Sequence, residues 1–321
     1  MRRTLQYVAM TKEERNEADG CFSTACQILI ENIKGISMIS SKLLGIVTFT
    51  YLICMVSYFT YLFFRNRKFG QVITGIAIFG LVVHTVALGM RWYESYQLGH
   101  GHIPLSNLYE SLMSLSWTTV IIYLIVEYRY KSKALGVFIF PLISIAMAYA
   151  SLSPNIQDEI EPLMPALQSN WLTYHVMTCF LSYSAFAISF GSSITYLVKY
   201  KKAEKKVPAG ADMSELFPSM ESLDDIIYKT IAIGFLLLTI GIITGAVWAN
   251  YAWGSYWSWD PKETWSLITW FMYAAFIHAR LTHGWHGRKT AILSIIGFAA
   301  VLFTFLGVNF LLSGLHSYGS K

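Results

Sequence analysis

The chain has 321 residues, of which 55% are hydrophobic and only 13% are charged. A soluble domain with this balance could not cover its surface with polar side chains, so the composition excludes a water-soluble protein and predicts one that lies in a bilayer. The net charge of +5 does not indicate nucleic-acid binding, because the lysines and arginines fall in short blocks between apolar runs.

Apolar runs long enough to span a membrane recur along the chain. At a rise of about 1.5 Å per residue, roughly 20 residues cross a hydrocarbon core of about 30 Å. In chain order the predicted spans are 43–64, 70–90, 107–128, 134–150, 171–198, 231–249, 266–282 and 290–312. The sequence therefore predicts an all-α fold, a polytopic transmembrane helix bundle of about eight spans, with a polar linker at 199–230.

Basic residues separate the connections between these spans into two alternating groups. The connections rich in lysine and arginine are those at 65–68, 129–133, 199–206 and 280–289. Because basic loops stay in the cytoplasm, the other connections are predicted to face outward, and an even number of spans makes both termini extracytoplasmic. Residues 1–42 are also basic, which departs from this rule. The half-apolar stretch 21–44 is predicted to form either an interfacial helix or a ninth span.

The outward loop at 250–265, before the seventh span, is unusually dense in tryptophan. Its sequence WGSYWSWDPKETW contains Trp253, Trp257, Trp259, Asp260 and Trp265. One interpretation is structural, because indole rings favour the headgroup region of a bilayer. On that interpretation Asp260, Pro261 and Glu263 occupy the N-cap, N1 and N3 positions of the next helix.

The second interpretation of the loop is a binding platform. Indoles gathered in one segment present flat, polarizable faces that suit a large planar ligand such as a porphyrin. Lys262, inside the motif, and Arg91, in another outward loop, are candidates to pair with carboxylates at the edge of such a ligand. The loop residues alone leave both interpretations open.

Two histidines are predicted to lie at the same side and depth as the tryptophans. His175 is near the outer end of the fifth span, and His316 is just beyond the outer end of the eighth. Neutral imidazoles can ligate a haem iron from opposite faces, so this pair favours the porphyrin interpretation.

The other histidines have different predicted roles. His278, near the cytoplasmic end of the seventh span, is a candidate ligand for a second haem, with a partner subunit or water as the other ligand. His84 is either an interhelical hydrogen-bonding residue or a further member of the cofactor site. The histidines predicted to be solvated polar residues are His100, His102, His283 and His286.

These motifs resemble the CcsA/ResC family of system II cytochrome c biogenesis, whose members carry a WWD motif. The resemblance lies in WGSYWSWDPKETWSLITW, in SGLHSY around His316, in NWLTYH around His175 and in the stretch 91–111. It covers residues 43–317, which it implies are a transmembrane haem-handling domain, and it leaves the role of residues 1–42 open.

The resemblance implies a haem transport and attachment subunit of a cytochrome c synthase. Haem b is then held at the outward face, where the two thiols of an apocytochrome CxxCH segment add across its vinyl groups. No residue resembles a separate catalytic acid or base. The implied haem-holding residues are Trp253, Trp257, Trp259 and Asp260, with His175, His316 and His278 at iron, and Trp265, Lys262, Glu263, Arg91 and His84 as further members.

The same resemblance implies partners and a location. A CcsB/ResB-type membrane subunit is expected to complete a holocytochrome c synthase, or haem lyase, and thioredoxin-like proteins are expected to keep the apocytochrome thiols reduced. The membrane is a bacterial inner membrane or a thylakoid membrane, with the site facing the periplasm or lumen. The alternatives are a haem exporter without catalysis, a dihaem electron-transfer subunit, or a non-haem transporter whose tryptophans only anchor it.

Overall fold

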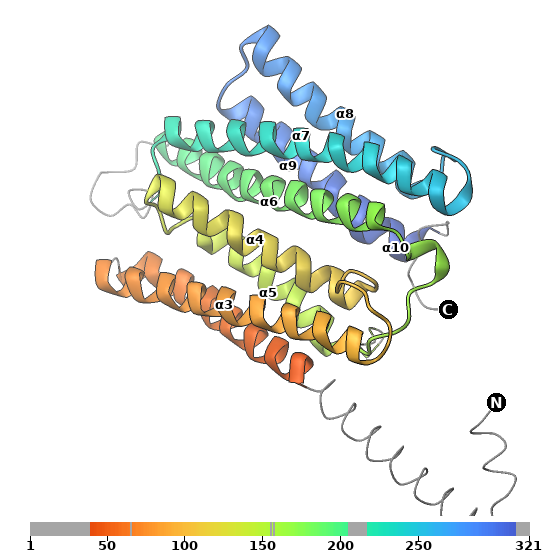
Figure 1. Cartoon of the computed structure of the whole chain (residues 1–321). Coiled ribbons are helices and arrows are strands. Elements are labelled where there is room, and N and C mark those ends of the chain that lie inside the picture. The colour runs from red at the N-terminus through yellow and green to blue at the C-terminus, as the bar shows by residue number, and fades with distance from the viewer. Residues whose placement is uncertain (1–38, 65, 155, 157, 205–216, 313–321) are drawn as a thin grey trace, which may run out of the picture.

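The computed structural model describes residues 39–64, 66–154, 156, 158–204 and 217–312. All regular structure within these residues is helical (Figure 1). The helices are Ile39–Phe64, α3 (Arg67–Gln97), α4 (Leu108–Tyr130), α5 (Gly136–Leu152), α6 (Asn170–Glu204), α7 (Met220–Trp253), α8 (Pro261–His283), α9 (Arg288–Leu302) and α10 (Val308–Leu311). The turn η1 (Pro165–Leu167) precedes α6, and a π-helical segment, η3 (Phe303–Gly307), joins α9 to α10.

The predicted all-α bundle is confirmed, and the eight helices within the described residues lie at the eight predicted positions when α9, η3 and α10 are taken as one. Six of them are long and apolar enough to cross a membrane, which makes this an integral membrane protein. The two exceptions are α5, with 17 residues, and α8, whose apolar residues are interrupted by tryptophan, tyrosine, histidine and arginine. The proposals for residues 1–38 and for His316 lie outside the described residues.

One predicted boundary is wrong. The stretch 199–230 was expected to be a linker, but α6 runs on to Glu204 and α7 already begins at Met220. Ser219 caps α7, because its hydroxyl accepts a hydrogen bond from the Ser222 backbone N–H at 3.1 Å. The apolar pattern marks only the part of a helix that meets lipid, so polar first turns are missed.

The helices are arranged in successive layers (Figure 1). The long helices α6 and α7 pack against each other in the centre, and α6 also contacts α4 and α9. The pair Ile39–Phe64 and α3 lies beyond α4 and α5, whereas α8 lies on the opposite side against α9. The start of α6, the end of α7, the start of α8 and α10 all lie at one end of the bundle, here called the motif end.

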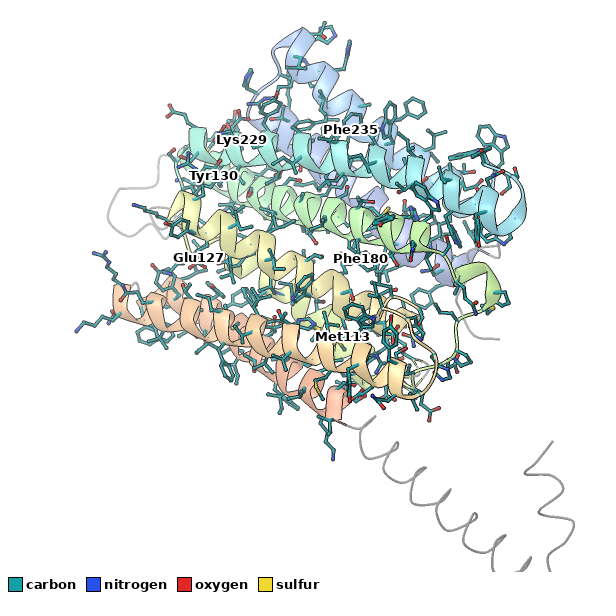
Figure 2. All side chains as sticks on the ribbon, in the orientation of Figure 1. Met113, Glu127, Tyr130, Phe180, Lys229 and Phe235 are labelled. Atoms are coloured by element: carbon teal, nitrogen blue, oxygen red, sulfur yellow. The ribbon has the colours of Figure 1, made fainter. Side chains whose placement is uncertain are left out.

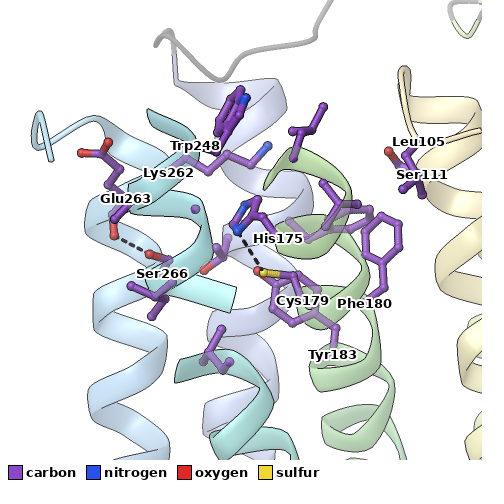
Figure 3. Close-up of a pocket in the computed structure, with 18 of the residues that line it drawn as sticks. Leu105, Ser111, His175, Cys179, Phe180, Tyr183, Trp248, Lys262, Glu263 and Ser266 are labelled. Carbon is purple, nitrogen blue, oxygen red and sulfur yellow. Dashed lines mark hydrogen bonds between the residues drawn. The ribbon is translucent and has the colours of Figure 1, made fainter. Parts of the chain in front are cut away.

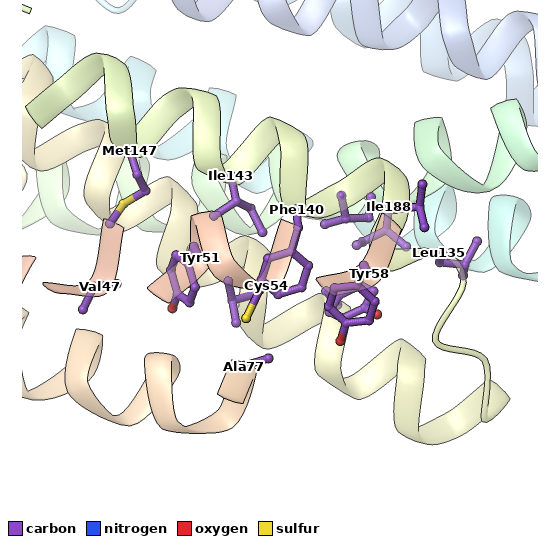
Figure 4. Close-up of a cluster of buried hydrophobic side chains, with 14 of the residues drawn as sticks. Val47, Tyr51, Cys54, Tyr58, Ala77, Leu135, Phe140, Ile143, Met147 and Ile188 are labelled. Atoms are coloured by element: carbon purple, nitrogen blue, oxygen red, sulfur yellow. The ribbon is translucent and has the colours of Figure 1, made fainter. Parts of the chain in front are cut away.

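An aromatic cluster holds the Ile39–Phe64 helix, α4 and α5 together (Figure 4). The ring of Tyr58 stacks on Phe140 at 4.9 Å between centroids and meets Tyr123 edge-on at 5.7 Å. Gly136 allows this contact, because a Cβ there would lie 2.6 Å from an atom of the Tyr58 ring. Such close aromatic packing stabilises the bundle at the end opposite the motif end.

The same end contains a buried carboxylate. Glu127 accepts hydrogen bonds from the hydroxyls of Tyr58 and Tyr123 at 2.8 Å each, and it pairs with Lys133 at 2.8 Å. Glu127 lies with Tyr130 and Lys229 at the end of the bundle away from Met113 (Figure 2). Its oxygens are therefore fully hydrogen-bonded, as a buried charge requires.

Candidate functional site

A large pocket opens at the motif end, between α6, α7, α8 and the η3–α10 segment, with the loop before α4 on one side. Its empty volume is about 1170 Å³, part of which is open to solvent. Most of the side chains that line it are apolar, as is common in cofactor sites. Figure 3 shows His175, Trp248, Lys262 and Glu263 on its walls, with Phe180 and Tyr183 deeper along α6.

His175 lies in this pocket in the second turn of α6. Its Nδ1 lies 2.7 Å from the carbonyl oxygen of Gly241 on α7, so Nδ1 carries the proton and donates it. That tautomer places the lone pair of the imidazole on Nε2. The ring is stacked parallel to the indole of Trp248, with centroids 6.3 Å apart and planes 10° from parallel. A histidine whose second nitrogen donates to a carbonyl is the usual arrangement for a metal ligand.

The structure brings some of the motif tryptophans to the pocket but not all of them. Trp257 lines the pocket, and Trp253 packs on the pocket residue Trp248 at 4.8 Å. Trp259 meets Trp257 edge-on at 5.8 Å but is 69% exposed. Trp265 instead packs on Phe303 at 4.1 Å and is not part of the lining.

The indole ring of Trp257 also carries a hydrogen-bond donor. Its indole Nε1–H is buried and has no hydrogen-bond partner among the described residues. A buried donor left without an acceptor costs roughly 1–3 kcal/mol, so an acceptor from a bound ligand would stabilise this arrangement.

The predicted helix cap at the start of α8 is confirmed. Asp260 is the N-cap, Pro261 is N1, and the carboxylate of Glu263 accepts the Asp260 backbone N–H at 3.2 Å. Glu263 also accepts the Ser258 backbone N–H at 2.8 Å, which ties the tryptophan loop to the helix. Both acidic residues therefore shape the loop, and Glu263 in addition lines the pocket.

Lys262 lies in the first turn of α8, before the segment predicted to span the membrane, and lines the pocket. Its ammonium donates to the side-chain oxygen of Asn309 on α10 at 3.1 Å. Burial lowers the pKa of Lys262 from 10.5 to about 8, although nearby Asp260 opposes this shift. The pocket thus contains a cation near neutral pH.

Arg91 is not among the pocket-lining residues. Its Nε donates to Glu110 at 2.7 Å, and both side chains are almost fully buried. One Arg91 Nη donates to the backbone carbonyl of Asp158 at 2.8 Å. Glu110 in turn accepts from the Ser106 backbone N–H at 2.8 Å, so the pair holds the loop that forms one wall of the pocket.

The remaining candidate histidines lie elsewhere. His84 is buried in α3, where its Nδ1 lies 3.3 Å from the hydroxyl of Tyr51, so the predicted interhelical hydrogen bond is confirmed. His278 is on the exposed face of α8, 5.6 Å from the ring of His283. His102 is buried rather than solvated, because its Nε2 hydrogen-bonds the Glu161 carbonyl at 2.9 Å, and that prediction was wrong.

Several pocket residues were not found from the sequence. Trp248, Cys179 and Asn309 line the pocket beside His175 and Lys262. A signal was present in α7, where Gly241 and Gly245 form a GxxxG pattern typical of close helix contacts in membranes. Trp248 follows that pattern by one helical turn, on the side of α7 that faces α6.

Comparison with known proteins agrees with these features. The model of the family described as "Cytochrome C assembly protein" matches residues 105–316. A relative from Guillardia theta named "Cytochrome c biogenesis protein CcsA" is 45% identical over 285 residues, which cover 84% of this chain and 93% of the relative. A relative of the same name from Microcystis aeruginosa is 43% identical over 289 residues, covering 77% of this chain and 86% of the relative.

A solved structure also has this fold. It is named "Cytochrome c Heme Lyase CcmF" and matches with a TM-score of 0.65 at 14% identity, over 84% of this chain and 47% of the longer protein. This chain therefore spans about half the length of that protein, and the likeness concerns the helical fold alone. By the family match and the high identity over most of its length, the chain belongs to the cytochrome c assembly proteins, among the relatives named CcsA.

Proposed function

We propose that this chain is the haem-handling subunit of a cytochrome c biogenesis system. It holds haem as cargo in the pocket at the motif end and presents it to the CxxCH segment of an apocytochrome. The observation that carries the proposal is His175, whose Nδ1–H donates to the Gly241 carbonyl inside a mostly apolar pocket that also contains several aromatic side chains. This tautomer offers Nε2 to iron.

The other pocket residues fit a porphyrin. Trp248, Trp257 and Phe180 supply aromatic surface for its faces. The ammonium of Lys262 suits a propionate carboxylate, and the buried indole N–H of Trp257 offers a second donor. Asp260 and Glu263 hold the loop that carries Trp257 and do not contact iron.

The chemistry supplied with haem is the addition of two cysteine thiols across its two vinyl groups, which gives two thioether bonds. The residues of this chain act by position: His175 fixes the iron, the indoles exclude water from the ring, and Lys262 orients the propionate edge. On this proposal His316 would be a second ligand to the iron, and His278 would belong to the route from the cytoplasmic side.

The proposed complex has further members. A CcsB/ResB-type membrane subunit completes the synthase, and thioredoxin-like proteins keep the apocytochrome thiols reduced. Since the basic connections are expected to be cytoplasmic, the motif end faces the periplasm of a bacterial inner membrane or the lumen of a thylakoid.

An absorption spectrum of the detergent-purified chain, oxidised and then reduced with dithionite, tests haem binding. Sharp low-spin haem bands are expected. Co-expression with an apocytochrome and a ResB-like subunit, in a host that lacks its own maturation system, tests attachment: covalent haem on the apocytochrome is expected. A colourless chain, purified both alone and with that subunit, would rule out haem handling, whereas haem without attachment would leave a carrier.

Lys262 gives the proposal a pH dependence. Because its pKa is about 8, the side chain is cationic below that pH and neutral above it. The affinity for a porphyrin dicarboxylate is therefore expected to fall as the pH rises through 8, where the charge-assisted contact is lost. Titration with zinc protoporphyrin between about pH 6.5 and about pH 9.5 measures this fall.

Two controls accompany that titration. The porphyrin dimethyl ester, which lacks carboxylates, is expected to bind with no such pH dependence. Lys262→Met is expected to bind the dicarboxylate weakly at every pH. Identical pH profiles for the wild type and Lys262→Met would show that another group binds the carboxylates.

A further inference from the structure

We infer that the stretch of α7 from Gly241 to Trp248 positions the imidazole of His175 and sets its strength as an iron ligand. This inference rests on the proposed function, since it concerns a ligand to haem. It assigns a task to residues of α7 that lie outside the tryptophan motif. Three features of the structure support it: a hydrogen bond, a steric requirement and a ring contact.

The hydrogen bond joins the His175 ring to the α7 backbone. The Gly241 carbonyl accepts Nδ1–H at 2.7 Å and also accepts the hydroxyl of Thr244 at 3.1 Å. No side chain on α7 supplies this acceptor, so it cannot be lost by a side-chain change at Gly241. The orientation of the ring therefore depends on how closely α6 approaches α7.

Two glycines permit that approach. A Cβ built at Gly245 would lie 2.6 Å from Nδ1 and 2.7 Å from Cε1 of His175. A Cβ built at Gly241 would lie 2.7 Å from the sulfur of Cys179, one turn further along α6. Distances this short are not tolerated between nonbonded atoms, so alanine at Gly245 would displace the imidazole.

Trp248 fixes the plane of the ring. The side chain of Trp248 is 1% exposed, and its indole lies parallel to the imidazole of His175. The indole of Trp253 meets that of Trp248 edge-on, with ring centroids 4.8 Å apart. A ring that has a fixed tautomer and a fixed plane presents its Nε2 in a single direction. Pre-organisation of this kind strengthens ligation without any new contact to iron.

The hydrogen bond also has an electronic consequence. Donation of Nδ1–H to a carbonyl makes the imidazole more basic and a stronger electron donor to iron. A stronger donor stabilises ferric over ferrous iron, which lowers the reduction potential of the bound haem. Gly245 is thus a positioning residue whose replacement is expected to raise that potential.

The test compares Gly245→Ala with wild type and with Gly89→Ala, a matched substitution at a helical glycine where a Cβ would have no atom within 4 Å. For the purified proteins, the reduction potential is measured by redox titration and the low-spin bands by absorption. Gly245→Ala is expected to show a higher potential and weakened low-spin bands. Gly89→Ala is expected to match the wild type in both.

A double variant separates ring displacement from damage to the helix pair. In a His175→Gly background supplied with imidazole, the imidazole is not tethered to α6 and can shift away from the new Cβ, so adding Gly245→Ala is expected to change nothing further. If Gly245→Ala alone fails to accumulate in membranes, recovery of the double variant with imidazole supports the inference equally.

Two results would overturn the inference. One is a Gly245→Ala protein with the potential and spectrum of wild type. The other is that Gly245→Ala causes the same loss of haem in the wild type as in the His175→Gly variant with imidazole. That result would mean that Gly245 serves only helix packing. Either result leaves the proposed function standing if wild type binds haem, whereas a colourless wild type removes the proposed function itself.

Discussion

Replacement of His175 by glycine is expected to remove the low-spin haem bands and to abolish haem attachment, and added imidazole is expected to restore both in part. Loss of a residue that hydrogen-bonds to a metal ligand commonly lowers metal affinity or activity about 10–100-fold. Loss of the ligand itself is expected to lower haem binding by more than that. Glycine leaves room for free imidazole between Trp248 and the pocket, because the ring it removes is stacked there. Absorption spectroscopy and covalent haem staining of a co-expressed apocytochrome measure the two effects.

Trp257→Ala provides the contrast. It removes both an aromatic wall and the buried indole N–H, neither of which imidazole can replace, so haem is expected to be lost without rescue. His283→Gly, at an exposed position far from the pocket lining, is the matched control and is expected to retain haem. Equal rescue of His175→Gly and Trp257→Ala would contradict separate ligand and platform roles.

The second large effect is expected at Arg91. Arg91→Ala leaves the buried carboxylate of Glu110 without its partner and is expected to lower the free energy of unfolding by about 3–5 kcal/mol. The Asp158 carbonyl and the loop at Ser106 lose their anchor in the same variant. Denaturation of the detergent-solubilised protein, followed by circular dichroism, measures the change.

A double variant tests what Arg91 does. Arg91→Met combined with Glu110→Leu replaces both charges with apolar side chains of similar size, and it is expected to recover most of the lost stability. If Arg91 serves only this pair, the double variant binds haem as wild type does. A stable double variant that has lost haem would instead support the sequence-based prediction that Arg91 pairs with a haem carboxylate.

The helices and the cap of α8 were predictable, because each depends on residues close together in the chain. An apolar run of sufficient length can only satisfy its backbone within lipid as a helix. Asp260, Pro261 and Glu263 likewise form a local pattern with local hydrogen bonds. The location of His175 at the motif end was predictable for a similar reason, since its position in its own span set its depth.

The convergence of residues from different helices was not predictable. Trp248 reaches His175 only because Gly241 and Gly245 let α7 approach α6, and the sequence does not fix which faces of two helices meet. The conformation of the tryptophan loop could not be predicted from the sequence either. Trp259 adopts a φ of 59°, which turns the chain sharply before the cap, so neighbouring indoles point in different directions.

The modest hydropathy of α8 has a consequence for how the protein is made. Its neighbours α7 and Arg288–Leu311 are long and apolar enough to cross a membrane, whereas α8 is not among the described helices that meet this requirement. A segment of this kind is retained in a bilayer by the helices on either side of it. During synthesis, α8 is therefore expected to enter the bilayer only once α9 has also been synthesised. The pocket, which needs α8 against η3 and α10, then becomes complete only after η3 and α10 have also inserted.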